Sequence, residues 1–153
     1  MTAARKIIID TDPGQDDAVA ILLALASPEL EVLGLTVVAG NVPLALTQKN
    51  ARVICELVGR RDVKILAGCD APLKRKLVTA EHVHGKTGLD GITLPEPAMP
   101  LAAGHAVDFL IETLRRETPG DPRSNDRTSR AFSSPLPSGA PKSPPLARAG
   151  RGA

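Results

Sequence analysis

Aromatic side chains are almost absent from this sequence of 153 residues, which contains no Trp, no Tyr and only Phe109 and Phe132. Proteins that bind single-stranded nucleic acid without sequence preference stack bases on aromatic side chains, so we do not expect a protein of that class. A formal net charge of only +2 gives no reason to expect another polyanionic partner.

Cysteines and long apolar runs are also scarce. Cys55 and Cys69 are too few for a disulfide framework and lack the spacing of metal ligands, so we expect small buried residues with free thiols. The N-terminus reaches Asp10 after only a short apolar run, which predicts no signal peptide, and no stretch has the length of a membrane span. These absences predict a cytoplasmic globular protein with no membrane partner.

The composition changes near Asp121. Residues 1–121 carry 13 Lys and Arg against 16 Asp and Glu, a net charge of −3, whereas residues 122–153 carry six basic residues against one acidic residue. The second segment is rich in Pro, Ser, Arg and Ala and contains no Val or Ile, so burial cannot offset its ordering entropy. We expect a folded portion over residues 1–121 and a disordered basic tail over residues 122–153.

Strand and helix patterns alternate within the first 121 residues. Short β-branched runs predict buried strands, and longer amphipathic stretches predict helices. The expected strands are Lys6–Asp10, Glu31–Val38 and Val63–Ala67, and the expected helices are Asp16–Ala26, Pro43–Val58 and His105–Glu117. The stretch from Asp70 to Leu101 is rich in Gly and Pro and is expected to be an irregular functional loop. The order predicts an α/β fold with a parallel sheet. Ligands of such sheets lie beyond the carboxyl ends of the strands, so we expect Asp10–Asp17, Asn41 and the loop over residues 70–91 to converge.

Four aspartates follow the first expected strand within eight residues: Asp10, Asp12, Asp16 and Asp17. Carboxylates crowded together repel one another unless a cation or shared protons relieve the repulsion. Oxygen ligands of this kind suit Ca²⁺ or Mg²⁺, and the reversal at Pro13-Gly14 lets carboxylates from both sides of the turn face one ion. Capping of the following helix is the simpler interpretation for Asp16 or Asp17, but it does not explain all four.

The chain resembles the nucleoside hydrolases, the inosine/uridine-preferring family that cleaves the N-glycosidic bond of ribonucleosides. The resemblance rests on KIIIDTDPGQDDAVAILLAL, on LGLTVVAGNVPLALTQKNA and on HGKTGLDG at His84–Gly91, and it covers residues 5–121. The last motif is most similar to the pyrimidine-preferring branch. The fold implied is the N-terminal part of a parallel, Rossmann-like nucleoside hydrolase sheet, and the family suggests a homo-oligomer.

The resemblance also implies roles for individual residues. Asp12 would be a Ca²⁺ ligand and the general base that deprotonates the attacking water, and Asp17 would be the second Ca²⁺ ligand. Asp16 and Asn41 would bind the ribose hydroxyls of a small-molecule ribonucleoside, and Asp10 would brace the loop from behind. His84 is expected either to contact the leaving base or to be an ordinary surface-loop histidine.

The family pattern is incomplete in this sequence. Further Ca²⁺ ligands and pocket residues of the family lie later in the chain and have no counterpart here, so we expect a truncated and impaired protein. One hypothesis is a frameshift near Asp121, because codons that could encode Asp121–Arg130, read one base later, permit Thr-Leu-Ala-Leu-Thr-Ile-Gly-Pro-Leu, a string of the family's character.

Two other interpretations stay open. Asp10-Thr11-Asp12 alone would permit a haloacid-dehalogenase-like phosphatase with an aspartyl nucleophile and Mg²⁺, although that class does not require Asp16-Asp17 or the Ala-Gly-Asn turn. The chain could also be an inactive fragment that binds a nucleoside or a cation without turnover.

Overall fold

The computed structural model describes residues 4–91 and 93–116. The expected disordered tail and the proposed frameshift at Asp121 both lie outside these residues. Within them, three parallel strands form one sheet in the order β1-β2-β3: β1 (Arg5–Thr11), β2 (Leu30–Val37) and β3 (Ile65–Ala67). The predicted α/β class and the parallel sheet are confirmed.

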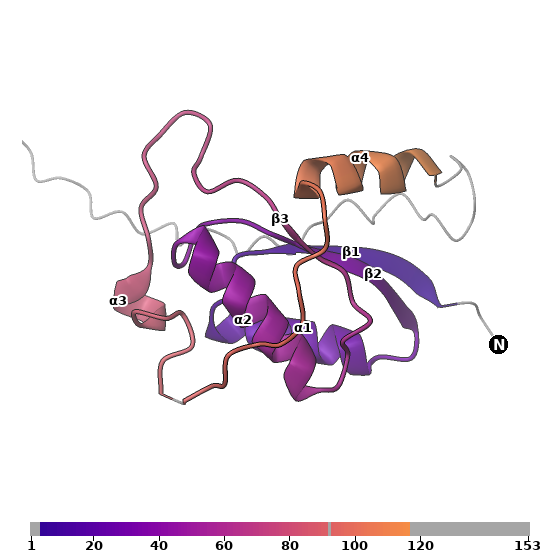
Figure 1. The fold of residues 1–153 in the computed structure, drawn as a ribbon, viewed down its shortest axis with the longest axis horizontal. Coiled ribbons are helices and arrows are strands. Elements are labelled where there is room, and N and C mark those ends of the chain that lie inside the picture. The colour runs from indigo at the N-terminus through magenta and orange to yellow at the C-terminus, as the bar shows by residue number, and fades with distance from the viewer. Residues whose placement is uncertain (1–3, 92, 117–153) are drawn as a thin grey trace, which may run out of the picture.

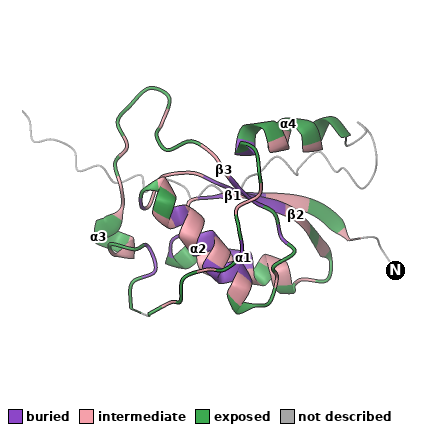
Figure 2. Ribbon diagram, viewed as in Figure 1, coloured by how far each residue is buried: buried purple, intermediate pink, exposed green. Residues whose placement is uncertain are grey.

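Two helices connect the strands and lie on the same face of the sheet (Figure 1). They are α1 (Gln15–Ala26) and α2 (Leu44–Leu57). The core lies between these helices and the sheet, where Ile21 of α1 and Ile54 of α2 are almost fully buried, as are Leu35 and Ile65 on the strands. Figure 2 shows burial concentrated where these elements meet.

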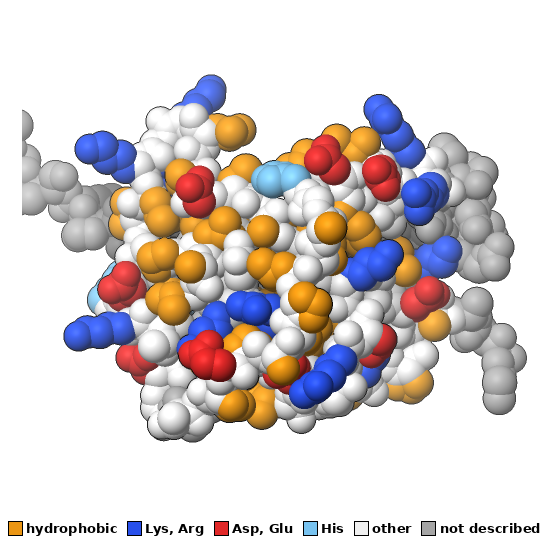
Figure 3. Space-filling model, in the orientation of Figure 1, with side chains coloured by type: hydrophobic (Ala, Val, Ile, Leu, Met, Phe, Trp, Pro, Cys, Tyr) orange, Lys and Arg blue, Asp and Glu red, His pale blue; other side chains and the backbone are white. Residues whose placement is uncertain are grey.

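The opposite face of the sheet carries α4 (Ala106–Arg116), as Figure 1 shows. Gly34 of β2 makes this approach possible, because a Cβ atom there would lie 2.9 Å from the ring of Phe109. The helix is only partly covered: Val107, Ile111 and Leu114 remain 43–58% exposed. On the face of the molecule seen in Figure 3, apolar side chains lie among charged side chains of both signs.

Several details differ from the sequence-based expectations. The third strand is shorter than expected because Val63 and Lys64 precede the paired residues. A short helix, α3 (Glu81–His84), lies in the stretch expected to be irregular. Cys55 is buried as expected, but the prediction for Cys69 was wrong, because its side chain is exposed. No helix within the described residues is both long and apolar enough to span a membrane.

Candidate active site

The carboxyl ends of β1 and β2 meet at Asp12 and Asn41. The backbone N–H of Asn41 donates to Asp12 Oδ2 at 2.7 Å, and Asn41 Nδ2 donates to the Asp12 carbonyl at 2.9 Å. Gly40 is required at this contact, since a Cβ atom would lie only 2.0 Å from Asp12 Oδ2. Hydrogen bonds therefore connect the loop after β1 to the loop after β2, as expected where neighbouring parallel strands end at the same edge of the sheet.

Asp17 is the most enclosed carboxylate of the loop, at 6% exposure. Its Oδ1 accepts from Thr11 Oγ1 at 2.9 Å, while Oδ2 accepts from the Gly14 N–H at 3.1 Å and from Asn41 Nδ2 at 3.2 Å. The bond from Gly14 satisfies a free donor at the start of α1, so the capping interpretation holds for Asp17. The same bonds fix its carboxylate beside Asp12.

Burial raises the pKa of Asp12, and the negative charges of Asp17 and Asp16 raise it further. The hydrogen bond from the Asn41 backbone opposes this shift because it stabilises the charged form. The net result is a half-buried carboxylate that holds its proton more tightly than a solvated one. It is consequently a stronger base when ionised.

Asp10 and Asp16 are the other two aspartates that follow the start of β1. Asp10 points at β2, where its Oδ1 accepts from Thr36 Oγ1 at 2.7 Å. The side chain of Asp16 is 61% exposed, and its Oδ1 lies 3.8 Å from His84 Nδ1. The structure therefore brings Asp12, Asp17 and Asn41 into direct contact and places Asp10, Asp16 and His84 around them.

His84 reaches the loop because α3 is anchored to the end of β2. The backbone N–H of Ala80 donates to the Asn41 carbonyl at 2.9 Å, and α3 starts at the next residue. The imidazole then lies so close to Gly14 that a Cβ atom there would be 2.8 Å from His84 Nδ1. This placement argues against an unconnected surface histidine, because the ring is only 15% exposed.

Asn50 was not identified from the sequence as part of the site. It is 4% exposed, and its Nδ2 donates to the carbonyls of Pro13 at 3.0 Å and Thr87 at 2.8 Å. It therefore joins the aspartate loop, which we define as residues Asp10–Asp17, to the loop that follows His84. In the sequence it is simply one polar residue on a helix, and only its position on the buried face of α2 could have singled it out.

Asp90 stabilises the loop that follows His84. Its carboxylate accepts from the backbone N–H groups of Lys86 and Thr87 and from the Thr87 hydroxyl, and these bonds lower its pKa. Gly85, with φ of 78°, passes directly beneath this carboxylate. These bonds hold the turn that contains Lys86 and Thr87 in place.

The described residues suit a hard cation in the type of donor but not in number. Asp12 and Asp17 supply carboxylate oxygens, whereas Ca²⁺ takes about six to eight oxygen ligands. Within residues 4–91 and 93–116, no group of three or more His, Cys, Asp or Glu side chains is arranged to hold a metal ion. The described residues thus offer two neighbouring carboxylates, and water or other polypeptide would have to supply the remaining oxygen ligands of such an ion.

Several curated proteins are similar in sequence to this chain. The chain is 56% identical over 115 residues to an uncharacterized protein of Schizosaccharomyces pombe and 49% identical to the pyrimidine-specific ribonucleoside hydrolase RihA of Photobacterium profundum. Each match covers 75% of this chain and 37% of the relative. The chain therefore spans little more than a third of the length of these relatives.

A solved structure is similar as well. The purine-preferring ribonucleoside hydrolase from Gardnerella vaginalis superposes with a TM-score of 0.69 at 32% identity, over 73% of this chain and 37% of that one. Residues 7–124 match the model of one family, and the match sets aside the phosphatase interpretation. The chain belongs to the inosine-uridine preferring nucleoside hydrolase family, whose members are N-ribosyl glycosidases.

Proposed function

We propose that this chain carries the aspartate-loop half of an active site that hydrolyses the N-glycosidic bond of a ribonucleoside to ribose and free base. The observation that carries the proposal is the cluster of Asp12, Asp17 and Asn41 at the adjoining ends of β1 and β2. The family match supports the reaction class. For the chain by itself, we propose no turnover, because the described residues supply only part of a metal shell.

Asp12 is the proposed general base. Glycosidic cleavage by water needs a group that accepts the proton of the attacking water, and its transition state resembles an oxocarbenium ion. The half-buried Asp12 carboxylate suits both needs: burial, the largest cause of its raised pKa, strengthens it as a base, and its negative charge would stabilise the developing positive charge. The hydrogen bond from Asn41 keeps one of its oxygens in place while the other accepts the proton.

The ribose is proposed to lie over the exposed rim of the loop. Asp16 presents an exposed carboxylate and Asn41 a side-chain amide, and both groups can hydrogen-bond sugar hydroxyls. Asp10 braces β1 against β2 through Thr36 without facing the rim. His84 lies beside Asp16 and is proposed to contact or protonate the departing base.

The proposed metal is Ca²⁺, held by the carboxylates of Asp12 and Asp17. When bound, such an ion polarises a water molecule and lowers the pKa of that water. The already crowded carboxylates favour a cation, because the repulsion that raises the pKa of Asp12 would be relieved. A homo-oligomeric assembly and a cytoplasmic location remain proposals that rest on the resemblance and on the composition.

Ribose release tests the function. Residues 1–121 would be fused to the part of Photobacterium RihA that has no counterpart in this chain, and reducing sugar would be measured with uridine, cytidine and inosine in CaCl₂. We expect turnover by the fusion protein and none by the 153-residue chain. Robust ribose release by the short chain would overturn the proposed inactivity, and hydrolysis of a chromogenic phosphate ester instead of nucleosides would overturn the proposed reaction.

A further inference from the structure

Asn50 joins the segment that carries His84 to the segment beside which the His84 ring lies. Its Nδ2 donates to the Pro13 carbonyl at 3.0 Å and to the Thr87 carbonyl at 2.8 Å. Pro13 immediately precedes Gly14, the residue closest to the ring on the aspartate loop. Thr87 belongs to the turn that follows His84. One buried amide therefore uses both of its N–H donors to connect the two segments.

The loop after His84 passes Asn50 at close range. Gly88 has a φ of 81°, and a Cβ atom there would lie 2.9 Å from Asn50 Nδ2 and 3.3 Å from the Pro13 carbonyl oxygen. Any larger residue would be strained at this φ and would press the loop away from the amide. Glycine at this position therefore permits the bonds that Asn50 makes.

The backbone on both sides of the His84 ring is anchored. Before the ring, the Ala80 N–H attaches the start of α3 to the loop after β2. After the ring, the Thr87 carbonyl accepts from Asn50, and Leu89 packs in the core further along the loop. Asn50 is thus the buried polar anchor that lies nearer to the ring on this side.

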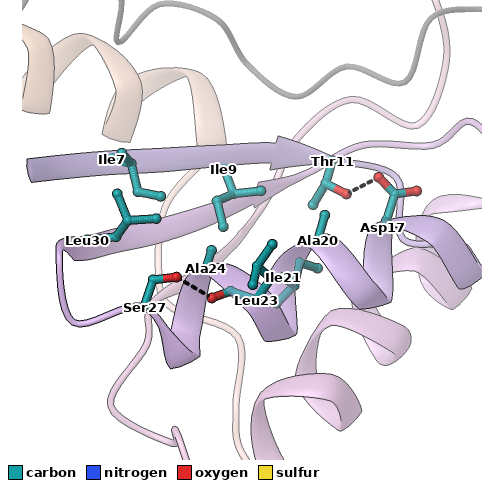
Figure 4. Close-up of a pocket in the computed structure, with 10 residues that line it drawn as sticks. All are labelled: Ile7, Ile9, Thr11, Asp17, Ala20, Ile21, Leu23, Ala24, Ser27 and Leu30. Atoms are coloured by element: carbon teal, nitrogen blue, oxygen red, sulfur yellow. Dashed lines mark hydrogen bonds between the residues drawn. The ribbon is translucent and has the colours of Figure 1, made fainter.

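The carboxylates of the aspartate loop are held by other donors. Asp17 accepts from Thr11 Oγ1 at 2.9 Å, as drawn in Figure 4, and Asp12 accepts from the Asn41 backbone N–H at 2.7 Å. Neither bond involves Asn50. Loss of the Asn50 donor would therefore release the loop that follows α3 and leave these carboxylates in place.

We propose that Asn50 is a positioning residue that holds the His84 imidazole against the aspartate loop, at a fixed place relative to Asp12. Asn50 touches no substrate and acts through the loop that follows His84. In the proposed reaction Asp12 activates the water and His84 serves the departing base, so Asn50 governs the departure of the base. This catalytic consequence rests on the proposed function, whereas the placement of the ring does not.

Acylation of the three histidines in the 153-residue chain tests the placement. Diethyl pyrocarbonate would be applied to the folded chain at neutral pH, and tandem mass spectrometry would give the rate at each ring. His84 is 15% exposed and should react more slowly than the exposed His82 on the same helix. Asn50→Ala should raise the ratio of the His84 rate to the His82 rate about tenfold, because one buried donor no longer opposes local opening.

Ile54→Val is the matched control on the same helix, since it removes a buried methyl group but no donor; the ratio should stay within about twofold. Gly88→Ala disturbs the Asn50 contact from the loop side and should also raise the ratio. Gly91→Ala should not, because a Cβ atom there meets nothing within 4 Å. If Asn50→Ala unfolds the chain, the two glycine variants decide. An unchanged ratio in Gly88→Ala, or an equal rise in its control, would overturn the proposal.

Turnover by the fusion protein tests the consequence for the base. Uridine leaves more readily when its base is protonated or hydrogen-bonded, whereas p-nitrophenyl riboside releases a phenolate that needs no proton. Asn50→Ala should lower kcat for uridine about tenfold or more and kcat for the aryl riboside less than about twofold. Equal losses would overturn the proposed link to base departure. A fusion protein that hydrolyses neither substrate would contradict the proposed function, and the acylation rates would still decide the placement.

Discussion

The two helices that cover the same face of the sheet are buried to very different extents. Helix α2 has six buried residues, whereas α1 has two, Asp17 and Ile21, although α1 is the more apolar sequence. Helix α2 contacts α1, β2 and β3, whereas α1 contacts α2 and β2 and lines a cavity together with β1. Among the described residues, the number of elements that a helix contacts therefore decides its burial more than its apolar content does.

The largest effect is expected from truncation in the well-covered helix. Ile54→Ala on α2 removes side-chain volume from a site that is 2% exposed and should lower the free energy of unfolding by about 2–5 kcal/mol. Leu23→Ala on α1, at 68% exposure, should change it by less than about 0.5 kcal/mol. Urea unfolding of both variants measures the contrast. Equal losses would remove the distinction between the helices.

A second contrast concerns the polar residues of the two helices. Asn50→Ala on α2 leaves the carbonyls of Pro13 and Thr87 without their buried donor and should cost about 1–3 kcal/mol. Gln15→Ala on α1 removes an exposed bond to the Asp90 carbonyl and should cost much less. Hydrogen exchange should quicken in residues 84–90 of the Asn50 variant. An unchanged exchange rate there would contradict the bridging role of Asn50.

Asp12→Asn should stabilise the metal-free chain by about 0.5–2 kcal/mol at neutral pH, as is common when a strained functional group is relieved. The folded protein holds the Asp12 proton more tightly than the unfolded chain does. Its contribution to stability therefore falls as pH rises from the ordinary carboxyl pKa through the raised value, and it stays low above that. Thermal unfolding in chelator between acid and neutral pH would measure this.

Asp62→Asn is the matched control for that series. The bond from Arg60 lowers the pKa of Asp62, so Asp62 contributes stability above its ordinary pKa and loses it as pH falls through the folded value. The two variants should thus shift the pH profile in opposite directions. If both variants changed the pH dependence of stability in the same direction, burial and repulsion would not be raising the pKa of Asp12.

The smallest perturbation is a chemical label on the two thiols. Burial raises the pKa of Cys55 on α2 to about 11, whereas Cys69 is exposed. Iodoacetamide at neutral pH should label Cys69 in the native chain and should reach Cys55 only after unfolding, because the thiolate is the reactive form. Mass spectrometry would detect each adduct. Rapid native labelling of Cys55 would mean that α2 is less firmly packed than described.

The sequence predicted the strands well because β-branched runs such as KIII favour the extended backbone of a strand. It also predicted that the loops after β1 and β2 converge, since parallel strands end at one edge of the sheet. It missed α3, whose four residues are too few to show helical periodicity. The exposure of Cys69 and the bridge made by Asn50 depend on contacts distant in the chain, which no local pattern records.

The chemistry proposed for the β1–β2 edge depends most directly on Asp12. The decisive measurement is the kcat for ribose release from uridine by the fusion protein of residues 1–121 with the RihA segment, with Asp12 and with Asp12→Asn. We expect a loss of about 10²–10⁴-fold with the folded state retained, the range for removing a general base, while Asp62→Asn leaves kcat unchanged. Equal turnover by the Asp12→Asn variant would contradict the assignment of this carboxylate as the base.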